Sequence, residues 1–145
     1  MGDLNRTVDV NLRLKSTGAI TASAACQVDG SAQILDVGQA EFAGMVEIDV
    51  SALKITANDE TYDIVMQGSS DSDFGTAANI VELGGIHLGA KEIKRTDSDA
   101  DDATGRYLLP FINIRNGTTY RYLRLYMVVG GTSPSFNFTA HASRW

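Results

Sequence analysis

The sequence predicts an all-β protein, an antiparallel β-sandwich of jelly-roll-like type with little helix. Two observations lead to this prediction. Apolar and polar residues alternate in several short segments, which is the pattern of half-buried strands. Segments rich in glycine, serine and asparagine separate them and supply turn chemistry. The 145 residues suit one domain with its own core, so we expect a single β-sandwich domain over residues 1–145.

The alternation is clearest within the first 90 residues. Strands are expected where Val, Ile, Leu, Tyr or Met occupy every second position, and at two shorter apolar runs. The segments are residues 8–14, 46–51, 62–67, 80–81 and 86–88. Helical periodicity is weak. Residues 19–25 and 76–83 could each hold a turn or two of helix.

Three longer strand-like runs come next, at residues 106–114, 120–129 and 135–141. They are rich in aromatic and β-branched residues, which fit a pleated surface. Between the first two lies Asn116-Gly117, whose positive φ angles suit the type I′ turn of a hairpin. Pro110 lies within the first run, so we expect that strand at a sheet edge or bulged there. Eight or nine strands in this length favour the jelly roll.

Charge is distributed unevenly along the chain. The formal net charge is −6. It divides into −1 for residues 1–40, −10 for residues 41–102 and +5 for residues 103–145, where no acidic residue occurs. Either the fold separates these segments into two surfaces of opposite sign, or it interleaves them on one surface.

Catalytic and metal-binding motifs are lacking, so we expect no enzyme and no cofactor. The sequence has only two histidines, His87 and His141; a cupin-like metal site would need both beside a carboxylate such as Glu82. Cys26 is the single cysteine and has no base nearby in sequence, which indicates a small buried side chain. The alternative is that both histidines have no role in metal binding and are either hydrogen-bonded within the fold or exposed to solvent.

An acidic segment, Asp97 to Asp102, resembles a calcium loop only in part. Asp97, Asp99 and Asp101 match the first three oxygen positions of an EF-hand loop. Asp102 then replaces the glycine, and Leu108 replaces the final glutamate. A solvated acidic loop, or a looser calcium site together with Asp71 and Asp73, both stay open.

Nucleic-acid and membrane partners are not expected. The sequence pI is about 4.7, whereas nucleic-acid binders are usually basic. No apolar run reaches 18 residues, and the first residues lack the layout of a secretion signal. We therefore expect synthesis in the cytoplasm of the cell that makes the protein.

The run at residues 120–129 carries the candidate site. Strand alternation places its leucines, Met127 and Val129 on a core face. The opposite face is too aromatic for a merely solvated surface, and tyrosine and arginine are enriched at protein interfaces. Its candidate interface residues are Tyr120, Tyr122, Arg124 and Tyr126. The alternative is that another part of the same domain covers this face.

The C-terminal third resembles the capsid cement, or decoration, proteins of short-tailed phages. The matching segments are Tyr107-Leu108-Leu109-Pro110-Phe111, the turn at Asn116-Gly117, Arg121-Tyr122-Leu123-Arg124-Leu125-Tyr126, the loop Gly130-Gly131-Thr132 and a last strand over residues 135–143. Residues 64–74, a strand running into a Ser/Asp loop, are also similar. Together the matches cover about half the chain.

This resemblance implies a jelly-roll-like structural virion protein that is not an enzyme. Such a protein lies on the outer surface of the phage head and bridges subunits of the major capsid protein. It also associates with itself, and we expect a homodimer or homotrimer. An alternative from a different class is a jelly-roll carbohydrate-binding or receptor-binding module, since exposed tyrosines stack on sugars.

Overall fold

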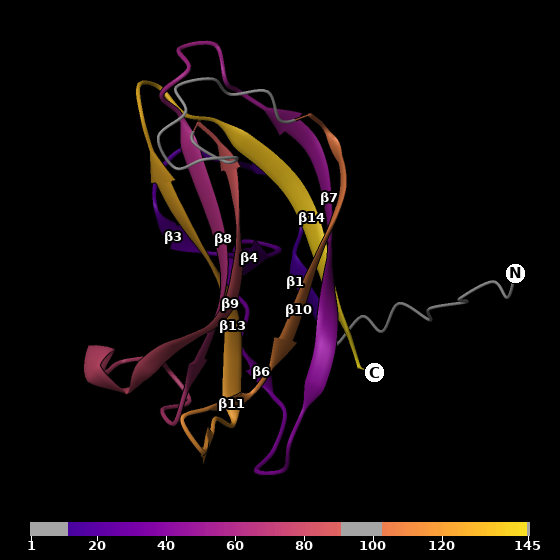
Figure 1. Ribbon diagram of the computed structural model, residues 1–145, viewed down its shortest axis with the longest axis vertical. Helices are drawn as coiled ribbons and strands as arrows, with labels where there is room; N and C mark the ends of the chain where they lie inside the picture. Colours follow the sequence, from indigo (N-terminus) through magenta and orange to yellow (C-terminus); the bar gives the residue numbers. More distant parts are fainter. Residues whose placement is uncertain (1–11, 91–102, 145) are drawn as a thin grey trace, which may run out of the picture.

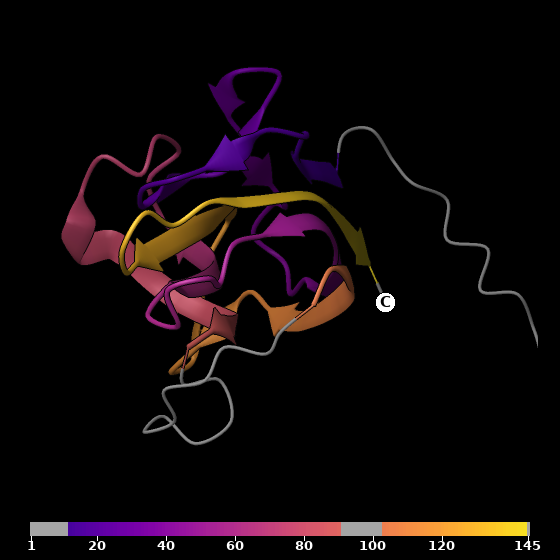
Figure 2. The same cartoon turned by 90° about the horizontal axis from the view of Figure 1, so that it is seen from above.

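Two antiparallel sheets pack face to face in the computed structural model, which describes residues 12–90 and 103–144 (Figures 1 and 2). The first sheet has the order β1(Arg13–Lys15)–β14(Phe136–Arg144)–β7(Ala43–Leu53)–β10(Gly105–Ile112), and β2(Ala19–Ile20) also pairs with β14. The second has the order β3(Ala24–Ala25)–β13(Tyr122–Gly130)–β8(Thr61–Ser69)–β9(Ile80–Gly89), and β6(Leu35–Asp36) also pairs with β13. Two small ribbons, β4(Gln27–Val28) with β5(Ser31–Ala32) and β11(Ile114–Arg115) with β12(Thr118–Thr119), complete the described strands.

The strand order is that of a jelly roll. Counting β1, β3, β7, β8, β9, β10, β13 and β14 as one to eight, the two sheets run 1-8-3-6 and 2-7-4-5. This order is two interlocked Greek keys, and it brings both ends of the described chain into one sheet. The predicted all-β sandwich is confirmed.

The core lies between the sheets and follows the alternation of the strands. In β7, Val46 and Ile48 are fully buried, while Glu47 between them is half-buried on the outer face. Tyr62 is the largest fully buried side chain and stacks on Phe136 with ring centroids 4.9 Å apart. Its hydroxyl donates to the Lys54 carbonyl at 2.6 Å and accepts from the Ser135 amide, so a polar tip is satisfied inside an apolar core.

One side of the sandwich closes where the edge strands β9 and β10 meet. The sequence suggested two separate short runs in β9, but the structure forms one strand with a bulge at Leu83, because Met66 pairs with Gly84 and Gln67 with Glu82. A Cβ on Gly84 would lie 3.1 Å from the Pro110 carbonyl oxygen, so glycine permits the close approach. Pro110 therefore occupies an edge strand, as predicted.

Local predictions fare unevenly. Asn116 and Gly117 have φ angles of 51° and 77°, as the predicted type I′ turn requires, and they join β11 to β12. The helical turns considered for residues 19–25 are wrong, because this alanine-rich segment pairs as β2 and β3 and tertiary pairing overrides propensity. In residues 76–83 only a 3₁₀ turn, η2(Ala77–Asn79), precedes β9. Of the strand predicted at residues 8–14, residues 8–11 lie outside the described part.

Candidate interaction surfaces

Strand β13 separates a core face from an outer face, as the alternation predicted. Leu123, Leu125 and Met127 point into the core and are at most 1% exposed. The outer face, which we call the β13 face, consists of Tyr122, Arg124, Tyr126 and Val128. The first three are half-buried, whereas Val128 is 42% exposed.

Arg124 is packed by its own domain. Its guanidinium lies 4.3 Å from the ring centroid of Phe74 and 5.2 Å from that of Tyr126, and its Nε donates to Gln67 Oε1 at 2.9 Å. This partial burial lowers the pKa of the guanidinium. Phe74 comes from the loop between β8 and η2 and is only 6% exposed. The loop therefore covers the middle of the β13 face, and Tyr126 and Val128 remain at its accessible end.

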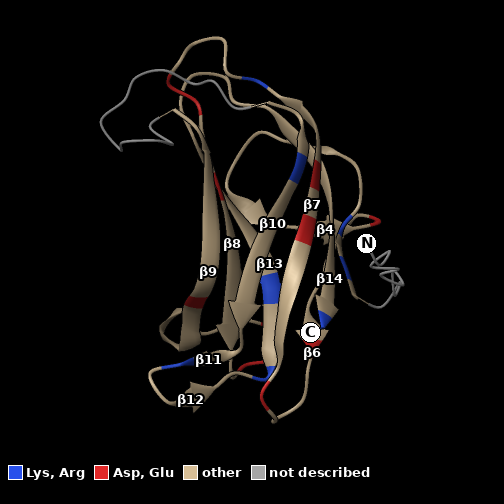
Figure 3. Cartoon of the chain, turned by 45° about the vertical axis from the view of Figure 1, so that its right-hand side comes forward, with Lys and Arg blue, Asp and Glu red and all other residues tan. Residues whose placement is uncertain are grey.

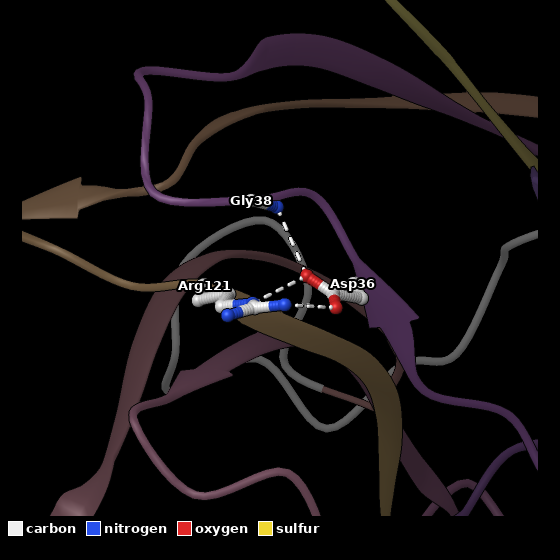
Figure 4. A network of polar contacts seen from close by, with 3 residues as sticks. All are labelled: Asp36, Gly38 and Arg121. Carbon is white, nitrogen blue, oxygen red and sulfur yellow. Dashed lines mark hydrogen bonds and ion pairs between the residues drawn. The ribbon is translucent and has the colours of Figure 1, made fainter.

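An ion pair secures the start of β13 (Figure 4). Arg121 donates through Nε and Nη2 to the two carboxylate oxygens of Asp36, both at 2.7 Å, and the Gly38 amide donates to Asp36 Oδ1 at 3.0 Å. The Arg121 guanidinium, followed by the Gly38 amide, lowers the Asp36 pKa to about 2. Arg121 also lies 5.2 Å from the ring of Tyr122, so this contact helps to hold the first tyrosine of the β13 face.

Tyr120 lies before β13 and is anchored through its backbone. Its amide donates to the Asn113 carbonyl at 2.8 Å, and its own carbonyl accepts from Asn113 Nδ2 at 3.0 Å. Asn113 is fully buried, and its Oδ1 accepts from the Phe42 amide at 2.7 Å. The structure thus brings Tyr122, Arg124 and Tyr126 together on one strand face, while Tyr120 belongs to the connection. Sequence reasoning missed Asn113, since one asparagine before a turn resembles many others.

A shallow groove of about 370 Å³ borders the accessible end of the β13 face. Val65, Gly85 and Val128 are among the residues that line it. On β9, His87 Nδ1 lies 2.5 Å from Asp63 Oδ1, and His87 Nε2 lies 2.7 Å from the Ala90 carbonyl oxygen. The imidazole therefore lies between two oxygen atoms, one from a carboxylate and one from a backbone carbonyl. No local pattern in the sequence indicated this pair, because Asp63 and His87 meet only through the register of β8 and β9.

The histidines and carboxylate considered for a cupin-like site do not form one. His87 lies on β9 in the second sheet, whereas His141 lies on β14 in the first sheet, opposite Glu47. Within residues 12–90 and 103–144 no cluster of three or more His, Cys, Asp or Glu side chains could hold a metal ion. The segment 97–102 lies outside the described residues. Asp71 accepts from Asn79 Nδ2 and Asp73 from the Gly75 amide, so both carboxylates organise their loop.

Two buried polar groups near the start of the described chain have structural roles. Lys15 is 3% exposed, and its Nζ donates to the carbonyls of Ser16, Gly18 and Phe138 at 2.8–2.9 Å. Burial raises the pKa of the Cys26 thiol to about 12, with Lys15 opposing the shift. The Cys26 side chain is 1% exposed, so it is a buried thiol, as the sequence indicated.

The described charges interleave, as Figure 3 shows. Arg106 pairs with Asp49 across β10 and β7 at 2.8 Å, and Arg121 pairs with Asp36. Two arginines of the acid-free C-terminal third thus neutralise acids from earlier segments. The sequence left two arrangements open, and the described part of the chain follows the interleaved one.

The outer face of the first sheet carries a second exposed apolar feature. On the edge strand β10, Leu108 is 47% exposed and Ile112 is 38% exposed, with exposed Pro110 between them. We call these three residues the β10 strip. Half-buried Met45 and Ala43 of β7 lie opposite Pro110 and Ile112 and widen the strip.

Two sequence comparisons were made with known proteins. Scanned against models of protein families, the chain matches none, and a search of curated proteins finds no matching sequence. Among the described residues, no helix is long and apolar enough to span a bilayer.

Proposed function

We propose that the protein is a structural virion protein, a capsid cement or decoration protein that binds the outer surface of a phage head and bridges major capsid protein subunits. The proposal rests on the resemblance of the C-terminal third to that family. One observation on the fold supports it most directly: the large exposed hydrophobic side chains of the described residues lie on opposite outer faces of the sandwich. Leu108 and Ile112 are on the first sheet, and Val128 is on the second.

A bridging protein needs at least two contact surfaces. In this proposal the accessible end of the β13 face, Tyr126 and Val128, binds the major capsid protein. The β10 strip joins two copies of the chain, because a strip at a sheet edge can face its own copy across a two-fold axis. A homodimer satisfies this geometry; a homotrimer would need a second, different patch. Many weak contacts of this kind give strong total attachment on a lattice.

Rebinding to capsids tests the proposal. Capsids of the phage that encodes the chain, purified without this protein, are mixed with the purified protein and sedimented, and their DNA loss on heating is measured. We expect saturable co-sedimentation and DNA release at a higher temperature. A protein that stays in the supernatant at tens of micromolar, or leaves DNA release unchanged, would contradict the proposal.

A carbohydrate-binding or receptor-binding module is the second candidate. The groove beside Val128 favours it, since carboxylates, His87 and apolar side chains line it, and Tyr126 pairs with Val65 of the lining. Aromatic faces and carboxylates are the groups that bind sugars. A glycan array with the wild type and with Tyr126→Ser would distinguish the two functions. Binding lost in the variant favours the module, and no binding by the wild type removes it.

A further inference from the structure

The shallow groove of about 370 Å³ beside Val128, which we call the β8–β9 groove, is laid out by the register of three neighbouring strands (Figure 1). Residues paired across β13, β8 and β9 form three successive rows on the outer face of the second sheet, which are Val128, Asp63 and His87; Tyr126, Val65 and Gly85; and Arg124, Gln67 and Glu82. The lining includes Asp63 from the first row and Glu82 from the third. Val65 and Gly85 line it from the row between. An apolar stretch of the lining therefore lies between two carboxylates.

Gly85 keeps the middle of the groove free of a side chain from β9. Its φ lies outside the left-handed region, so the backbone conformation alone does not require glycine. A Cβ there would lie 3.7 Å from Val65 Cγ2, which is ordinary contact, and 3.3 Å from the Ile64 carbonyl oxygen, which is tight. A larger side chain would occupy the space beside Val65, whereas glycine leaves that space to a side chain from outside.

Both carboxylates of the lining have unused acceptor capacity. Asp63 Oδ1 contacts His87 Nδ1, whereas no described residue donates to Asp63 Oδ2. The exposed Glu82 carboxylate has neither a hydrogen bond nor an ion pair within residues 12–90 and 103–144. The Asp63 side chain is 37% exposed, so a donor that arrives from solvent can reach both groups.

Two arginines close to the groove leave these carboxylates unpaired. Arg124 is fixed against two rings of its own domain. Arg115 donates from Nη1 to the Glu82 carbonyl oxygen at 2.6 Å, but not to the Glu82 carboxylate. The titratable groups of the lining are Asp63, Glu82 and His87, so its charge is negative whether the imidazole is neutral or protonated. A cationic group is therefore the ligand that complements the lining.

We propose that the β8–β9 groove binds one basic side chain, a lysine or an arginine, that a partner protein presents. Its aliphatic stem packs beside Val65 and Val128. Its charged end pairs with the carboxylates of Asp63 and Glu82. Lysine and arginine combine an apolar stem with a charged end, which matches the apolar and acidic parts of the lining. That this partner is the major capsid protein rests on the proposed function, whereas the chemistry of the groove does not.

Salt should affect this contact more than the apolar part of the same interface. Exposed ion pairs are screened as the ionic strength rises, because the Debye length falls from about 10 Å at 0.1 M to about 3 Å at 1 M. Burial of apolar surface from Tyr126 and Val128 is not screened in this way. Added salt should therefore weaken partner binding by the wild type more than binding by a variant without the groove carboxylates.

Titration with short peptides tests the site without any capsid. The probes are Gly-Arg-Gly and Gly-Gln-Gly, both acetylated and amidated, added to the isotope-labelled full chain and followed by NMR. For the basic peptide we expect saturable shifts of the groove amides with a Kd of about 1–10 mM, and none for the neutral peptide. Asp63→Asn/Glu82→Gln should weaken binding about ten-fold. The matched control, Asp29→Asn/Glu41→Gln, removes two exposed acids elsewhere and should bind like the wild type.

A single variant keeps the test valid if the loss of the contact between Asp63 and His87 alters the fold. Glu82→Gln removes only an exposed charge and should weaken binding of the basic peptide several-fold. Equal affinities of Glu82→Gln and the wild type, or no saturable shift of the groove amides in the wild type, would overturn the proposal.

Two further results distinguish the proposal from its alternatives. Lactose, a neutral sugar, serves as a third probe: shifts with lactose and none with the basic peptide would overturn the proposal in favour of the carbohydrate-binding module. Peptide binding as expected, together with no rebinding to capsids, would support the groove and contradict only the proposed virion function.

Discussion

Strands β13 and β10 follow the same alternation, yet their outer faces differ. Arg124, in the middle of the β13 face, is packed between Phe74 and Tyr126 and bonded to Gln67. The β10 strip has no such cover among the described residues, and Leu108 is 47% exposed. In this molecule the strand face rich in tyrosine and arginine is partly packed by side chains of its own domain. The strand face with aliphatic residues is the more exposed of the two.

The largest effect should come from the core face of β13. Leu125 is 1% exposed, so Leu125→Ala should lower the free energy of unfolding by about 2–5 kcal/mol through lost burial and a cavity. Val128→Ala, on the outer face of the same strand, should change it by less than about 1 kcal/mol. Urea denaturation measures both. Similar losses would mean that the two faces of β13 are not distinguished by burial.

Next in size is the packing of Arg124. Arg124→Ala removes two ring contacts and a hydrogen bond, so we expect a loss of about 1–2 kcal/mol in urea denaturation. Arg124→Lys should recover only part of it, because lysine lacks the planar guanidinium. The control is Arg106→Ala, whose exposed ion pair with Asp49 should contribute less to stability than the packing of Arg124. Equal effects of Arg124→Ala and Arg106→Ala would show that the β13 face is no more organised than the surface of β10.

The β10 strip should affect association more than folding. Leu108→Asp/Ile112→Asp should leave urea stability within about 1 kcal/mol of the wild type, since both residues are exposed. In sedimentation velocity at tens of micromolar, we expect the wild type and Ser51→Asp, on the same outer face, to be oligomeric and the strip variant to be monomeric. A monomeric wild type, or an oligomeric strip variant, would contradict the role given to the strip.

The smallest effect should come from the ion pair at the start of β13. The Asp36 pKa is lowered to about 2 by Arg121 and the Gly38 amide. A lowered pKa in the folded state stabilises the fold above the ordinary aspartate pKa, and that contribution is lost as the pH falls towards 2. Asp36→Asn should therefore lower the melting temperature slightly at pH 7, and the difference from the wild type should shrink between pH 4 and pH 2. A difference that grows on acidification would contradict this sign.

Local pattern predicted much of the fold. Alternation identified both faces of β13, and Asn116-Gly117 identified the hairpin of β11 and β12, because both depend on residues adjacent in sequence. The sequence did not show that β9 is one strand, since the bulge at Leu83 interrupts its pattern. It also missed the contact of Asp63 with His87, which depends on the pairing of distant strands. The sequence also could not show that Phe74 covers Arg124, because the position of a loop over a sheet depends on contacts between residues distant in sequence.

Capsid rebinding by a variant of the β13 face tests the central claim most directly. Tyr126→Ser/Val128→Asp alters the accessible end of that face and removes one of the two ring contacts of Arg124. Ser51→Asp provides a control with one added charge on the opposite sheet. We expect the double variant to fold normally, to remain oligomeric and to lose about ten-fold in capsid affinity, while Ser51→Asp binds like the wild type. A double variant that binds capsids as tightly as the wild type would contradict the claim that the β13 face contacts the capsid.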